Sequence, residues 1–160
     1  MKKFVIFLAI LLLVSFTGMA QAQLFVDPVA GPEVWVTSVY NNSGSSLSAG
    51  DVVIWDIASS TGDNDNYVTT TTAVDTTLIA GVVFPNSIGT GEIGSIAVRG
   101  AGIKVNTIAG GSVAVGTSLC TGATAGSASV CSETGGDPNR IGFCTSANTG
   151  SSCTAFISVL

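Results

Sequence analysis

The sequence has 160 residues, enough for one domain, and carries a formal net charge of −5 with no histidine. Its acidic balance excludes two classes of partner, the phosphate backbone of nucleic acids and anionic lipid surfaces. Without histidine the chain lacks the commonest general base and a usual zinc ligand. We therefore predict no catalytic residue, no zinc site and no cofactor, and hence no enzyme.

The first 22 residues are organised like a secretory signal peptide. Lys2 and Lys3 give a positive start, residues 4–16 contain a single polar residue, and Ala20-Gln21-Ala22 fits a small-x-small cleavage site. An uncleaved membrane anchor is the weaker interpretation, because the apolar run is shorter than the ~20 residues that a spanning helix needs. The mature chain would begin at Gln23 with three basic and ten acidic residues. We expect it in the periplasm, outside the cell or on the cell surface, without stable membrane insertion.

Residues 23–32 are expected to form an N-terminal arm, and residues 33–160 a single β-domain. Runs of β-branched and aromatic residues alternate with Gly-, Ser- and Asn-rich turns about every eight to twelve residues, which is typical of a sandwich or barrel. Gly102 is expected to permit a sharp reversal of the chain. The fold class is therefore all-β, a small barrel or sandwich of short antiparallel strands. Those strands are expected at residues 33–40, 51–57, 67–72, 78–84, 95–99, 103–108, 118–121, 127–133, 140–146 and 153–159.

All four cysteines lie in the last third of the chain, as Cys120, Cys131, Cys144 and Cys153. Each consecutive pair flanks a short turn-rich segment, as in a β-hairpin. Residues that face each other across an antiparallel hairpin are about 4.5–5.5 Å apart at Cα, within reach of a disulfide. We therefore predict Cys120–Cys131 and Cys144–Cys153 rather than the two other pairings. A metal site or redox-active pair is disfavoured, because the chain has no CxxC motif.

Several short segments share a composition rich in glycine, serine and threonine. They lie at residues 41–44 (NNSG), 47–53 (LSAGDVV), 68–72 (VTTTT), 79–83 (IAGVV), 115–119, 124–128 and 141–143. Together they resemble small phage head-decoration-like β-domains and similar pieces of bacterial surface and tail-fibre-associated proteins. The resemblance covers most of residues 34–160 and implies a compact β-barrel used for assembly or decoration, without catalysis. The signal peptide and paired cysteines depart from that pattern and indicate a module deployed outside the cytoplasm.

Asp63 and Asp65 alternate with asparagines in the segment DNDN and could bind calcium through their carboxylate oxygens. An EF-hand-type loop would have a third oxygen ligand where Tyr67 stands, so the match to that motif is poor. We interpret the segment as a solvated loop tip and keep the two aspartates as calcium candidates.

Four aromatic residues, Trp35, Tyr40, Trp55 and Tyr67, could form a platform that stacks on sugars. Both tryptophans lie in apolar strands, however, which favours core packing over ligand binding. Residues 41–43 also fit the N-glycosylation sequon, which we interpret as a chance match because the leader looks bacterial.

Two functions follow from these observations. The leading hypothesis is an exported structural module without enzymatic activity, which associates with copies of itself or with the lattice of a surface layer, fibre or phage-like particle. The alternative is a secreted module that binds carbohydrate or another small ligand through exposed aromatics. A monomer that binds glycans would favour the alternative.

Overall fold

The computed structural model describes residues 33–58, 66–108, 112–131, 139–147 and 150–159. The predicted signal peptide and N-terminal arm lie outside the described residues, and so do Asp63 and Asp65. Over the described ranges, the chain contains no helix with the length and apolarity needed to cross a membrane.

Over the described residues the chain is all-β, as predicted, and every element is a strand. The strands are β1 Trp35–Asn41, β2 Val52–Trp55, β3 Tyr67–Thr69, β4 Ile79–Val83, β5 Ile93–Asn106, β6 Ser118–Thr121, β7 Ala128–Val130, β8 Gly142–Cys144 and β9 Ser152–Ser158. Most are short, because glycines and other turn residues interrupt the β-branched runs.

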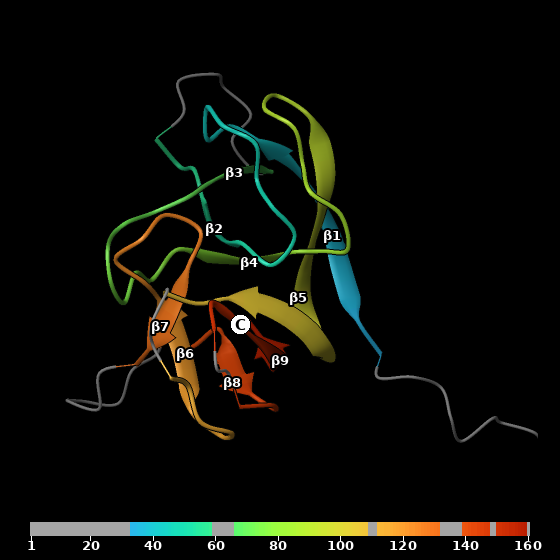
Figure 1. The fold of residues 1–160 in the computed structure, drawn as a ribbon. Coiled ribbons are helices and arrows are strands. Elements are labelled where there is room, and N and C mark those ends of the chain that lie inside the picture. The colour runs from blue at the N-terminus through green and yellow to red at the C-terminus, as the bar shows by residue number, and fades with distance from the viewer. Residues whose placement is uncertain (1–32, 59–65, 109–111, 132–138, 148–149, 160) are drawn as a thin grey trace, which may run out of the picture. The chain divides into compact units, whose positions relative to one another are not determined.

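Five strands close into a barrel in the order β1-β3-β2-β4-β5, and β5 returns to pair with β1 (Figure 1). All ladders of this ring are antiparallel except one. β1 and β3 run parallel, with Tyr40 beside Tyr67 and Asn41 beside Val68. The prediction of antiparallel strands is thus wrong for this pair. A parallel pair cannot be joined by a tight turn, so no local sequence signal marks it.

β5 is a single 14-residue strand, which corrects the prediction of two strands with a reversal at Gly102. Its first part pairs with β1 and β4, and its second part, to Asn106, pairs with β9. The register of the β5–β9 ladder shifts between Gly100 and Ile103. Gly102 has φ +77°, which glycine adopts at little cost. Here that freedom produces a β-bulge, and the strand continues in the same direction.

The other strands extend the sheet from β5 in the order β9-β8-β6-β7. Figure 1 shows β1–β4 around the first part of β5 and β6–β9 at its second part. An isolated parallel bridge between Thr107 and Ala128 joins the end of this extension back to the chain just after β5. The Ile108 N–H donates to the Ala128 carbonyl at 3.1 Å beside that bridge. The extension is therefore curled, and β5 belongs to both halves of the domain.

Each half has its own apolar core, and β4 is the wall between them. All five residues of β4 are buried, as expected for a strand with two covered faces. Ala80 and Val83 join the cluster that fills the barrel, together with Val39, Leu47, Val53, Val68, Ile88 and Ile96. Ile79 and Val82 join the larger cluster, which also includes Ile103, Leu119, Ile141, Cys144, Cys153 and Ile157.

Both predicted disulfides are present, Cys120–Cys131 and Cys144–Cys153, with Cα separations of 5.0 and 6.0 Å. Their strand register differs from the expected one. Cys120 faces Ser129, and Cys144 faces Ala155, so each bond joins residues that are diagonal across the ladder. A shift of two residues keeps both partners on the same face of a strand, which explains why the pairing survives the change of register.

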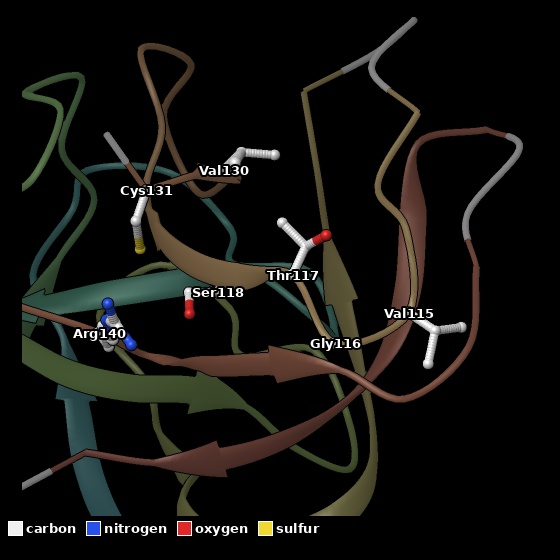
Figure 2. A pocket seen from close by; sticks show the side chains of 7 residues that line it. All are labelled: Val115, Gly116, Thr117, Ser118, Val130, Cys131 and Arg140. Atoms are coloured by element: carbon white, nitrogen blue, oxygen red, sulfur yellow. The ribbon is translucent and has the colours of Figure 1, made fainter. Parts of the chain in front are cut away.

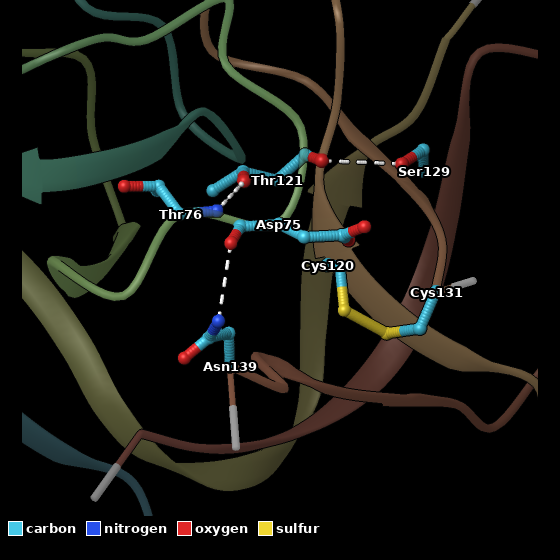
Figure 3. The surroundings of a disulfide bond; sticks show 7 residues. All are labelled: Asp75, Thr76, Cys120, Thr121, Ser129, Cys131 and Asn139. Atoms are coloured by element: carbon cyan, nitrogen blue, oxygen red, sulfur yellow. Dashed lines mark hydrogen bonds between the residues drawn. A yellow bond between two sulfur atoms is a disulfide. The ribbon is translucent and has the colours of Figure 1, made fainter. Parts of the chain in front are cut away.

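The segment before β4 covers the Cys120–Cys131 bond (Figure 3). The Thr76 N–H donates to Thr121 Oγ1 at 3.0 Å, next to Cys120. Asn139 Nδ2 donates to the Asp75 carbonyl at 3.1 Å and holds this segment from a second direction. Cys120 is fully buried, so this disulfide is a structural bond inside the domain.

Candidate functional site

The outer surface of the barrel over β1, β3 and β5 carries exposed apolar side chains. Tyr40 lies directly beside Tyr67, with ring centroids 4.8 Å apart. Ile93 faces Tyr40 from β5 and is 77% exposed, and Val36 is 52% exposed. Alternate residues of a strand point to the same face, so Val36 and Tyr40 share this side of β1. We call the surface made of Val36, Ser38, Tyr40, Tyr67 and Ile93 the outer aromatic face.

A pocket of about 260 Å³ opens on the outer aromatic face. It is lined by Ser38, Val39, Tyr40, Asn66, Tyr67 and Ile93. Its volume lies just below the ~300–1,000 Å³ range of most ligand sites. A tyrosine surface beside an amide and a hydroxyl offers both stacking and hydrogen bonding, the combination that a sugar ring requires.

Trp35 is 52% exposed, so the prediction of core packing is wrong for this residue. It lies beside Arg99 across the β1–β5 ladder, where the register shifts between Trp35 and Val36. The guanidinium carbon of Arg99 lies 5.4 Å from the centre of the indole ring, a cation–π distance. Trp35 therefore covers a charged side chain at the surface of the barrel.

Trp55 lies apart from the outer aromatic face. It pairs with the buried Val68 of β3 and packs, partly buried, against the cluster inside the barrel. The prediction of core packing is therefore confirmed for Trp55. Of the four aromatics singled out in the sequence, the fold brings together only Tyr40 and Tyr67, and the four do not form one platform.

A second, larger pocket of about 460 Å³ lies next to the Cys120–Cys131 disulfide. Figure 2 shows Arg140 and Val115 at its opposite ends. The rest of its lining is Gly116, Thr117, Ser118, Val130 and Cys131. Arg140 is one of only three basic residues after residue 22. The charge and hydroxyls of this pocket suit an anionic group such as a carboxylate.

Within the described residues, no group of three or more histidine, cysteine, aspartate or glutamate side chains is placed to hold a metal ion. All four cysteines are in disulfides. The calcium candidates Asp63 and Asp65 lie outside the described residues, so their role stays a prediction.

Sequence reasoning missed the exposed Val36, Ile93 and Arg140. An isolated apolar residue such as Ile93, between Glu92 and Gly94, gives no periodic signal. Arg140 does carry a sequence signal, because basic residues are rare in this acidic chain and each of them is a candidate for binding an anion. Val36 carries no such signal, because alternation alone does not tell which residues of an apolar strand face solvent.

Comparisons with known proteins show a likeness at the level of fold. No family model matches the sequence, and no curated protein matches it. Among solved structures, the chain is similar to the N base of the head fiber protein gp8.5 of bacteriophage phi29, with a TM-score of 0.51 and 22% identity. The match covers 79% of this chain and 95% of that chain. This protein therefore shares its β fold with the base of a phage head fibre.

Proposed function

We propose that this chain is an exported structural module that associates with further copies of itself, on a surface or in a particle, as decoration and fibre proteins do. The observation that carries the proposal is the likeness of its fold to a head fibre base, which extends over 95% of that chain. The likeness concerns the fold, and the surface and the cross-links of the domain support the role.

Two physical features support the proposal. Local disulfides are typical of small domains that work in oxidising surroundings outside the cytoplasm. The outer aromatic face leaves the apolar side chains of Val36 and Ile93 exposed on the same side of the sheet, and exposed apolar surface of this kind is characteristic of protein association.

Light scattering on the mature chain, residues 23–160, tests this function. The protein should be produced by export, so that both disulfides form. We expect a molar mass that rises with concentration from the monomer to a fixed multiple of it. A monomer at every concentration would contradict the proposal.

Binding of a carbohydrate is the second candidate, favoured by the tyrosine pair and Asn66 at the pocket on the outer aromatic face. A glycan array probed with the same material distinguishes the two functions. Strictly monomeric protein that binds a defined glycan, and loses that binding with Tyr67→Ala, would establish the second candidate in place of the first.

A further inference from the structure

Among the strands of the described residues, the first part of β1 has a neighbour on one edge and none on the other. On one side, β5 pairs with β1 from Trp35 to Tyr40. On the other side, β3 reaches only Tyr40 and Asn41. Along residues 36–38, none of the strands in the described part of the chain lies beside this second edge, which we call the β1 edge.

The ladder around β1 shows which backbone groups point to the β1 edge. The Asn41 N–H donates to the Glu92 carbonyl, on the β5 side, at 3.0 Å. The preceding N–H, of Tyr40, donates to the Asn66 carbonyl, on the β3 side, at 2.8 Å. Because successive residues of a strand bond to alternate sides, Val36 and Ser38 direct their N–H and C=O groups to the β1 edge. Both residues are exposed.

Nothing in the sequence of β1 protects this edge from another strand. Natural proteins blunt open edges with charged residues, proline or bulges. The sequence of β1, WVTSVYN, contains neither a charged residue nor proline, and its register shift lies at the start of the strand. Two copies of an acidic chain repel each other, and an uncharged edge is where they can approach at the lowest electrostatic cost.

We propose that the β1 edge pairs with the same edge of a second copy, antiparallel about a two-fold axis at Thr37. Val36 then faces Ser38 of the partner subunit and exchanges two backbone hydrogen bonds with it, and symmetry doubles this number. Thr37 faces Thr37 of the partner subunit in a non-hydrogen-bonded pair, about 4.5 Å apart at Cα. This inference rests on the proposed function, since it names the surface through which the module associates.

Cysteine cross-linking tests the register directly. No described cysteine is free, so Thr37→Cys adds a single new thiol at a position within disulfide reach of its symmetry mate. Mild oxidation of the mature protein should give a covalent dimer of twice the monomer mass, which a reductant reverses. Thr124→Cys, at a threonine that is more exposed than Thr37 and lies in the turn between β6 and β7, is the control and should stay largely monomeric. Equal cross-linking of the two variants, or none at Thr37→Cys, would overturn the inference, as would a product of any other mass.

Val36→Lys tests the same edge without a covalent bond. A lysine on each copy should raise the concentration for half-association by at least about tenfold, since charge on an edge opposes pairing. Val74→Lys, at a valine that is 51% exposed elsewhere, should leave association unchanged, and circular dichroism should show both variants folded. If the wild type associates and Val36→Lys associates equally well, the β1 edge is not the surface of association, while the proposed function stands. If the wild type itself is monomeric, both fail.

Discussion

Asn41, at the end of β1, shows how one buried polar side chain fixes a loop. It is 1% exposed, and its Nδ2 donates to the carbonyls of Ser45 at 2.7 Å and Gly89 at 3.0 Å. Its Oδ1 accepts from the Ser43 N–H at 3.0 Å. The amide thus joins the turn after β1 to the turn before β5. An asparagine buried in this way is not an acceptor for a glycan, which agrees with the interpretation of residues 41–43 as a chance sequon.

Asn41→Asp should therefore destabilise the protein strongly, although the two side chains have nearly the same shape. A carboxylate has no proton to donate and would face carbonyl oxygens in a buried site, at a cost of about 3 kcal/mol. Asn42→Asp is the matched control. Asn42 is exposed and its Nδ2 donates to Asp56 Oδ2 at 2.6 Å, so the cost there should be under about 1 kcal/mol. Urea unfolding of both variants measures the difference, and equal losses of unfolding free energy would contradict this account of Asn41.

The two tryptophans mark the limit of prediction at this scale. Trp35 and Trp55 both lie in apolar stretches of the sequence, so the sequence pattern predicts the same environment for both. Their environments differ because Trp35 precedes the register shift in the β1–β5 ladder, whereas Trp55 lies opposite an inward-facing valine. Which face of a strand is covered depends on strands distant in sequence, and that information is absent from a local pattern.

Among the elements, the cysteine hairpins were the most predictable part of the fold. Their partners lie only 11 and 9 residues apart, so the pairing depends on one turn each. The exact register was not predictable, because it depends on turn geometry that several sequences allow. The continuity of β5 is not predictable for a related reason. Gly102 is compatible with both a reversal and a bulge, and the pairing of β5 with the distant strands β1 and β9 decides between them.

Removal of either disulfide by a pair of Cys→Ser substitutions should lower the free energy of unfolding by about 2–3 kcal/mol in the chain-entropy model. The two losses should be similar, since the closed loops have nearly the same length. Cys120→Ser alone should leave Cys131 as a titratable thiol and should promote mispairing. Denaturant unfolding and a thiol assay check these outcomes. An unchanged unfolding midpoint after loss of either bond would contradict the structural role assigned to the pair.

For the whole molecule, the all-β class follows from the period of the sequence, whereas the closure of the barrel does not. The closure of the ring depends on the pairing of β1 with β5 and with β3. No short turn connects β1 to either of these strands. Such pairings are specified jointly by burial on both faces of β4 and by the inward residues of five strands. The outer aromatic face arises from the same closure. The sequence therefore indicates Tyr40 and Tyr67 as candidate residues, but it does not predict that their side chains are in contact.

The central claim, that this chain is an exported component of an extracellular assembly, can be tested most directly on material from its own source. Cell-surface and extracellular particle fractions should be purified, and the intact mass of the chain measured in them without reduction. The account predicts a chain that begins at Gln23, has both disulfides closed and sediments with an assembly. A chain that keeps residues 1–22, or that is found as a free monomer inside the cell, would contradict it.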